Sequence, residues 1–152
     1  MQELAQITDA VQELRGHSME DIEGWLLQQE QAPYETQHHF GPGVYIREAT
    51  LPAGTLVMGH AHRNPCLNVM LKGTMAVLID GAVKVIEGPA TFVSPAGRKL
   101  AYIIETTTIQ NVFATDETDV DKLEDLLVDK SDTWREHELE AGTQLLLAGE
   151  EI

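Results

Sequence analysis

Residues 54–73 read Gly54-Thr-Leu-Val-Met-Gly-His60-Ala-His62-Arg-Asn-Pro-Cys66-Leu-Asn68-Val-Met-Leu-Lys-Gly73, and the fold is decided in this stretch. The apolar and β-branched residues on both sides of the histidines favour an extended chain. Because side chains alternate between the two faces of a strand, His60 and His62 point to the same side. Two imidazoles that converge in this way make half of a metal site.

The stretch resembles the first signature of the cupin superfamily, which consists of a glycine, a His-x-His pair, a glutamate and a second glycine at fixed spacing. Gly54, His60, His62 and Gly73 fall in register with that signature. Cys66 stands at the position of the glutamate. The resemblance implies a jelly-roll fold in which the histidines are metal ligands.

Residues 88–104 resemble the second cupin signature, with one extra residue between Gly88 and Pro95. The turn Pro95-Ala-Gly97 is kept, but Leu100 stands at the position of the third histidine ligand and Ile104 at that of an asparagine. The match covers roughly residues 43–113. The wider pattern resembles small cupin-like proteins encoded by tailed bacteriophages, a group without a settled activity.

From Gly43 onward, short β-rich runs are separated by glycine and proline turns. Asp80-Gly81 between two apolar runs is a typical hairpin turn. This spacing predicts a mainly β protein, built as a cupin-like jelly roll or a small antiparallel β-barrel. The predicted strands are 44–51, 55–58, 66–71, 75–79, 83–86, 90–93, 100–104 and 107–113.

Helical periodicity flanks the strands on both sides. Apolar residues recur at three- and four-residue steps in 4–14, and Ser18 can cap a second helix. Beyond the strands, Thr118 and Ser131 can cap two more helices, the second of which ends at Gly142. We predict one globular domain with an N-terminal helical arm (1–40), a cupin-like β-barrel (41–115), and a C-terminal helical arm and tail (116–152).

The formal net charge of −15 is unevenly distributed over the 152 residues. Lys+Arg against Asp+Glu number 1 against 8 in residues 1–40, 6 against 3 in 41–104 and 3 against 14 in 105–152, which gives −7, +3 and −11. Because the phosphates of nucleic acid would repel both acidic arms, we expect no nucleic-acid partner. The arms suit either solvated faces or docking onto basic protein surfaces.

Compartment and redox state follow from simple absences in the sequence. No apolar run approaches the ~18 to 20 residues of a membrane span, and the N-terminal residues lack the pattern of a signal peptide. We therefore expect no membrane contact and synthesis in the host cytoplasm, with a virion as a further location. The single cysteine excludes an internal disulfide, so Cys66 is a buried hydrophobe, a ligand or an intermolecular link.

A candidate pocket follows from strand alternation. If His60 and His62 face inward, Cys66, Asn68 and Met70 share their face, with Leu100 and Tyr102 opposite. Two imidazoles and a thiolate could hold a single zinc, iron or copper ion. Because a third nitrogen or a carboxylate ligand is missing, the alternative is a degenerate pocket that holds no cofactor.

Two apolar segments predict contacts with partners. The strand 66–71 is apolar on both faces, so its outer face needs a cover from the chain's own helices or from a neighbour, and we expect a homo-oligomer. In the tail, Leu145, Leu146 and Leu147 form an apolar strip that could anchor the chain to a partner.

Three functions are compatible with these features. The leading hypothesis is a non-catalytic jelly-roll protein of a phage that acts through protein–protein contacts, for example as a virion or capsid-decorating component. The alternative is a metal-dependent cupin enzyme, oxygenase- or isomerase-like, that acts on a small molecule in the pocket. The third is small-ligand binding without turnover.

Overall fold

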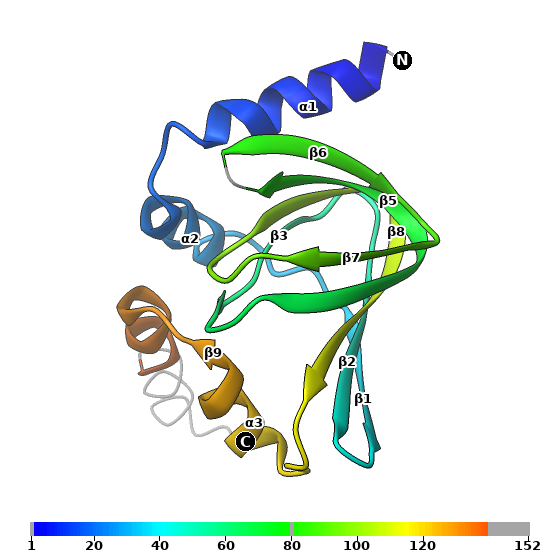
Figure 1. Cartoon of the computed structure of the whole chain (residues 1–152). Coiled ribbons are helices and arrows are strands. Elements are labelled where there is room, and N and C mark those ends of the chain that lie inside the picture. Colours follow the sequence, from blue (N-terminus) through cyan, green and yellow to red (C-terminus); the bar gives the residue numbers. More distant parts are fainter. Residues whose placement is uncertain (1, 80, 140–152) are drawn as a thin grey trace.

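The computed structural model describes residues 2–79 and 81–139, in which helices flank an antiparallel sheet (Figure 1). Residues 132–139 are also helical. In chain order the elements are α1 (Gln2–Leu14), α2 (Met19–Leu27), β1 (Glu35–Gly41), β2 (Val44–Leu51), β3 (Leu56–Met58), β4 (Ala61–His62), β5 (Cys66–Ile79), β6 (Ala82–Glu87), β7 (Ala90–Ser94), β8 (Leu100–Ala114), α3 (Val120–Leu127) and β9 (Val128–Asp129).

The main sheet has seven strands in the order β1-β2-β8-β5-β6, with β3 paired to β8 and β7 paired to β5. β4 and β9 form a second, two-stranded sheet. Within the described residues the path of strands is open, with β1 and β6 at its ends, so the protein is a jelly-roll-type sheet and not a closed barrel. The predicted mainly β class with helical extensions is confirmed.

β5 and β8 are the long strands of the sheet, with 14 and 15 residues. The predicted strands 66–71 and 75–79 both belong to β5, and the predicted strands 100–104 and 107–113 both belong to β8. The ladder between them shifts register between Met70 and Met75, and these bulges bend β5 so that one end pairs with β7 and the other with β6. Gly and Thr residues in the bends interrupt the apolar pattern of the sequence without ending the strands. For this reason the sequence pattern predicts a strand end at each bend.

Gly73 occupies the bend in β5 with a positive φ of 104°. A Cβ at this position would lie 2.6 Å from both the Thr107 Cα and the Thr106 carbonyl oxygen. On the opposite side, the Gly88 N–H donates to the Gly73 carbonyl oxygen at 2.8 Å. The conformation and the close approach of three backbone segments both require glycine.

The edge strand β1 lies inside the region that was predicted as a helical arm. All of its residues but one are exposed, so its sequence carries no apolar alternation that could reveal a strand. It is held by its register with β2, from Glu35 opposite Thr50 to Gly41 opposite Val44. The N-terminal helical region therefore ends with α2, and the sheet begins at Glu35.

The sheet has an apolar cluster on each face. One contains Met70, Met75, Val77 and Ile103 with residues of β2, and the other contains Ala76, Leu78 and Leu100. Val11 of α1 and Ile22 of α2 complete the second cluster. The N-terminal helices therefore cover the chain's own sheet, and Figure 1 shows α1 lying along β6.

The C-terminal region folds as short helices around β9. Asp119, and not Thr118, caps α3, because its side chain accepts from the backbone N–H groups of Asp121 and Lys122. Ser131 caps the next helix as predicted, with its Oγ accepting from the Trp134 N–H at 3.0 Å. The predicted helix end at Gly142 and the apolar strip Leu145, Leu146 and Leu147 lie outside the described residues. Of the helices in 2–79 and 81–139, none has the length and apolar character to cross a membrane.

Candidate functional site

The two halves of the cupin-like pattern meet at the short strand β4. The His62 N–H donates to the Gly97 carbonyl oxygen at 3.1 Å, and the Gly97 N–H donates back to the His62 carbonyl oxygen at 2.9 Å. Gly97 adopts a positive φ of 103°, which closes the turn that begins at Pro95. On its other side β4 pairs with β9, where His62 lies opposite Val128. The histidine pair therefore lies between the sheet and the C-terminal region.

Aromatic rings hold both imidazoles in place. The ring of His60 meets that of Trp134 edge-on, with centroids 5.0 Å apart, and the ring of His62 lies 5.9 Å from that of Phe113. The Nδ1 atoms of both histidines and the Nε1 atom of Trp134 are buried, and none of them has a hydrogen-bond partner among residues 2–79 and 81–139. Buried polar side-chain atoms are nearly always paired, so three orphaned nitrogens in one region mark a candidate site.

The charge state of the two histidines is set by burial and by neighbouring cations. Burial lowers the pKa of His60, and the charges of Lys130 and Arg98 lower it further. Burial also lowers the pKa of His62, with added effects of Lys99 and Arg47. The carboxylates of Glu23 and Glu124 act in the opposite direction on His60 but do not outweigh burial. Both imidazoles are therefore neutral at pH 7.

Cys66 does not complete a metal site with the histidines. The residue is 2% exposed, and its Sγ lies 3.4 Å from the Leu67 carbonyl oxygen and 3.9 Å from that of Val112. Burial raises the pKa of the thiol, which favours the protonated form that binds metals poorly. In the part of the chain that the structure describes, no group of three or more His, Cys, Asp or Glu side chains is placed to hold a metal ion. As they lie, the three predicted ligands do not fit a metal.

Asn68 and Met70 lie on one face of β5 together with Cys66, as predicted, since all three are buried. The amide of Asn68 is already engaged. Its Nδ2 donates to the Ser94 Oγ at 2.9 Å and to the Cys66 carbonyl oxygen at 3.0 Å, and its Oδ1 accepts from Asn111 Nδ2 at 2.6 Å. Asn68 therefore links three strands and is not free to bind a ligand.

Leu100 and Tyr102, predicted to line the same pocket, lie elsewhere. Leu100 is fully buried in the cluster beneath α1 and α2, and Tyr102 packs against that cluster. The register of β8 explains the difference, because Leu100 lies opposite Leu78 and Tyr102 opposite Ala76, whose side chains point away from Met70. The bulges in β5 set that register, and the sequence does not reveal it.

A largely buried ion pair between Arg98 and Glu23 connects the segments around the histidines. Arg98 donates from Nη1 to Glu23 Oε1 at 3.1 Å and from Nη2 to Oε2 at 2.5 Å. The Ser131 Oγ donates to the same carboxylate at 2.5 Å, and Arg98 Nε donates to the Gly59 carbonyl oxygen at 3.1 Å. This group, which we call the Arg98 clamp (Glu23, Gly59, Arg98 and Ser131), joins α2, the histidine loop (residues 59–62) and the C-terminal region.

Glu23 and Trp134 were not predicted as members of this site, although a sequence feature marks each of them. Glu23 lies four residues after Met19 and three before Leu26, so it is a charge on the apolar face of α2. Trp134 is the one large aromatic residue in the otherwise polar segment 131–138. A charge on an apolar face and an aromatic residue on a polar helix both indicate a specific tertiary partner.

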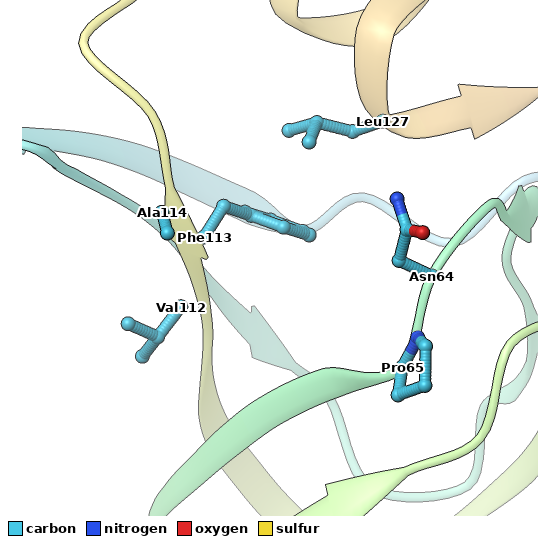
Figure 2. A pocket seen from close by; sticks show the side chains of 6 residues that line it. All are labelled: Asn64, Pro65, Val112, Phe113, Ala114 and Leu127. Atoms are coloured by element: carbon cyan, nitrogen blue, oxygen red, sulfur yellow. The ribbon is translucent and has the colours of Figure 1, made fainter.

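A pocket of about 250 Å³ lies beside Phe113, whose ring also lies 5.9 Å from that of His62. Figure 2 shows the ring of Phe113 extending into the space between Leu127 and Pro65, whereas Val112 points away from it. The pocket lies between the end of β8, the segment before β5 and the end of α3. Its lining residues are Asn64, Pro65, Val112, Phe113, Ala114 and Leu127.

Solved structures similar to this chain share its architecture at low sequence identity. Ectoine synthase from P. lautus has a TM-score of 0.50 at 14% identity, and the match covers 68% of this chain and 83% of that protein. KdgF from Halomonas sp. has a TM-score of 0.49 at 15% identity, covering 62% and 90%. An RmlC-like cupin family protein from Methanocaldococcus jannaschii has a TM-score of 0.47 at 18% identity, covering 64% and 91%.

Comparisons at the level of sequence give no relative. No protein-family model matches the chain, and no curated protein matches it in sequence. The structural likeness therefore bears on the fold alone, and the activities of these proteins do not transfer to this chain. Together with the order of the strands and the meeting of the two signature segments at β4, the likeness shows that the chain has a cupin-type jelly-roll fold.

Proposed function

We propose that this protein is a non-catalytic jelly-roll protein that acts through protein–protein contacts, and that its first partner is a second copy of itself. The observation that carries the proposal is an uncovered apolar row on the outer face of the sheet. Ile46, Val112, Leu67 and Val93 lie opposite one another on β2, β8, β5 and β7, so their side chains share one face. Four strands at sheet spacing make this outer row about 14 Å wide.

The outer row is not covered by the chain's described helices. Leu67 is 41% exposed and Val93 is 66% exposed, while α1 and α2 cover Ala76 and Leu78 further along β5. Apolar side chains gathered on an open sheet face are typical of interaction surfaces. In the folded chain the outer face of strand 66–71 therefore still exposes apolar side chains that a partner could cover.

Charge restricts where on the surface a second copy can dock. Two copies that each carry a net charge of −15 repel one another wherever their acidic regions meet. The outer row is uncharged, and in the next row Glu48 is engaged by His39 at 3.6 Å and by Gln110 Nε2 at 2.8 Å. A two-fold contact brings the same uncharged apolar row of both copies together.

We further propose that the oligomer is a component of a phage particle, such as a capsid-decorating protein. The sequence resemblance to small phage-encoded cupin-like proteins supports this setting. The acidic arms suit basic surfaces on a capsid or other virion protein, and Leu145, Leu146 and Leu147 would add an apolar anchor. Deleting residues 143–152 should then leave the oligomer intact and abolish attachment to the particle, and unchanged attachment would contradict this assignment.

The oligomeric state tests the proposed contact. Light scattering should find the wild-type protein as a dimer or higher symmetric oligomer, and Leu67→Lys should make it monomeric with unchanged far-UV circular dichroism. Val85→Lys is the matched control, because Val85 is 43% exposed on β6 outside the outer row and its change should leave the oligomer intact. A monodisperse wild-type monomer at micromolar concentration would rule out the second copy as partner.

A metal-dependent enzyme, oxygenase- or isomerase-like, is the second candidate. The Nδ1 atoms of His60 and His62 favour it, since buried imidazoles that lack partners in the described part of the chain suit a function other than packing. Elemental analysis of the purified protein decides the matter. About one transition metal per chain that is lost in His60→Ala/His62→Ala would support the enzyme, whereas metal-free protein with the same melting temperature would eliminate it.

A further inference from the structure

We propose that the open edge of β1 pairs with β1 of a second copy, so that two sheets join across a two-fold axis into one continuous sheet. This edge contact is separate from the face contact proposed above, and it rests on that contact only for the size of the final assembly. β1 is one end of the strand path, and among the described residues it pairs with β2 alone (Figure 1). Every second residue of such a strand turns its backbone N–H and C=O groups toward the open edge, where a further strand can bind them.

The two edges of the sheet differ in their protection. Figure 1 shows α1 lying along β6, and Arg15, just after α1, donates from Nη1 to the Gly81 carbonyl oxygen at 3.1 Å. In β1, by contrast, every residue but Thr36 is exposed. Natural edge strands are commonly blocked by a lysine, a proline or a bulge. The sequence of residues 35–41 contains neither lysine nor proline, and its register with β2 runs without a bulge. β1 is therefore an edge that is open to pairing.

The length of β1 selects one register for a two-fold contact. Antiparallel pairing engages all seven residues of both strands only when the axis passes at His38. Partners then lie an even number of residues apart in sequence, so backbone groups that face the edge meet groups that also face it, and about six to eight hydrogen bonds form. The resulting pairs are His38 with His38, Gln37 with His39, Thr36 with Phe40 and Glu35 with Gly41.

The side chains of β1 suit this register. Phe40 is 44% exposed, and its ring stacks on that of Tyr45 with centroids 5.2 Å apart, so it is held in place at the edge. In the paired sheet Phe40 lies opposite Thr36 of the second copy, and pairs of an aromatic and a β-branched residue stabilise antiparallel strands. Edge pairing therefore covers an aromatic ring that the single chain leaves partly in water.

The charges of β1 do not oppose the contact, although the whole chain carries −15. Glu35 is the one acidic residue in 35–41. In the full register the two Glu35 carboxylates lie at opposite ends of the contact, about 20 Å apart. This separation exceeds the Debye length of about 8 Å at physiological ionic strength, so their repulsion is largely screened.

The edge contact by itself is small. Seven residues extend for about 24 Å along one strand, which gives less surface than the roughly 1,200 to 2,000 Å² that stable partners bury. We therefore expect it to be too weak to hold two chains together at micromolar concentration. Copies already joined by the face contact form two edge contacts at once, and the second gains from a high effective concentration. Two-fold contacts of two kinds close most simply into a tetramer.

Cysteine cross-linking tests the register on the full chain with Cys66→Ala. His38→Cys places two thiols opposite each other at the axis, with Cα atoms about 4.5 to 5.5 Å apart, within the range of a disulfide. Gln37→Cys is the matched control, because its two copies lie about 8 Å apart. On oxidation His38→Cys should form a disulfide-linked dimer at least about tenfold faster than Gln37→Cys. A mixture of Gln37→Cys and His39→Cys should form the mixed disulfide.

A charge at the axis tests the same contact without oxidation. Light scattering should find a wild-type tetramer, which His38→Lys should reduce to a dimer because like charges directly opposite destabilise a strand pair. Val85→Lys on β6 should leave the tetramer intact.

The outcomes separate the edge contact from the face contact. Equal cross-linking of His38→Cys and Gln37→Cys, or a wild-type oligomer that His38→Lys leaves unchanged, would overturn the edge contact and make a strand of a partner protein the occupant of this edge. An oligomer that His38→Lys dissociates and Leu67→Lys does not would support the edge contact and overturn the face contact.

Discussion

Arg98 and Glu23 form a two-pronged ion pair between residues 75 positions apart, with distances of 3.1 Å and 2.5 Å. Their side chains are 13% and 5% exposed, so the pair is largely shielded from water. Burial by itself would raise the pKa of Glu23, but the hydrogen bonds from Arg98 and Ser131 and the charge of Arg98 lower it below its ordinary value of 4.5. The pair is therefore ionised at neutral pH and holds α2 against the histidine loop.

Breaking the Arg98 clamp should destabilise the protein strongly. Arg98→Ala leaves the Glu23 carboxylate buried without its cation, and we expect a loss of about 3 to 5 kcal/mol in the free energy of unfolding, measured by urea denaturation. The double variant Arg98→Met/Glu23→Gln should lose less, because it removes both charges. Arg63→Ala is the matched control, since the Arg63–Asp129 pair is 47% and 65% exposed and should contribute less than about 1 kcal/mol. Equal losses in Arg98→Ala and Arg63→Ala would contradict this account of the clamp.

The bend at Gly73 should tolerate no side chain. Gly73→Ala combines a positive φ with a Cβ placed 2.6 Å from backbone atoms of residues 106 and 107, so we expect a loss of about 2 kcal/mol or more in thermal or urea unfolding. Gly54 has a similar φ of 83° but open space around its Cβ position. Gly54→Ala should therefore cost only about 1 kcal/mol. A milder effect at Gly73 than at Gly54 would show that the bend is not tight in solution.

Stability should fall in acid in two steps. The pKa values of His60 and His62 are lowered from 6.5, mainly by burial, so the unfolded chain takes up protons first as the pH falls. The contribution of the two neutral histidines to the free energy of unfolding is present above pH 6.5 and is lost as the pH drops through their folded-state pKa values. Glu23, with a pKa below 4.5, adds a second loss at lower pH.

Melting temperatures measured across pH check this expectation. His60→Gln/His62→Gln should flatten the decline just below pH 6.5 while keeping the more acidic step. His17→Gln, at an exposed position, should leave the whole profile unchanged. An unaltered first step in the double variant would assign the proton uptake to other groups.

The thiol of Cys66 should be inert in the native protein. It is buried, its pKa is raised by burial, and its Sγ faces two backbone carbonyl groups. We expect a disulfide-exchange reagent to label it only as fast as the protein unfolds, and at once in denaturant. Rapid stoichiometric labelling of folded protein, or a disulfide-linked dimer on oxidation, would contradict a purely packing role.

Local sequence patterns determined much of this fold. The runs at 44–51 and 90–93 became β2 and β7 almost residue for residue, because each lies within one strand with no bulge. Gly54, Gly73 and Gly97 of the cupin-like pattern all adopt positive φ values, a demand that acts on a single residue and is therefore visible in the sequence. The apolar stripe of α1 predicts its contact with the sheet, because the stripe depends only on the local sequence of the helix.

The features that define the candidate site depend on the tertiary structure. β1 is held by its neighbour and not by any pattern of its own, and the bulges in β5 decide that Leu100 and Tyr102 face the helices. The Arg98–Glu23 pair and the Trp134–His60 contact join segments that are distant along the chain. Strand alternation predicts that His60 and His62 point to the same side, but the charges and rings around them were decided by long-range packing, which neither periodicity nor spacing encodes.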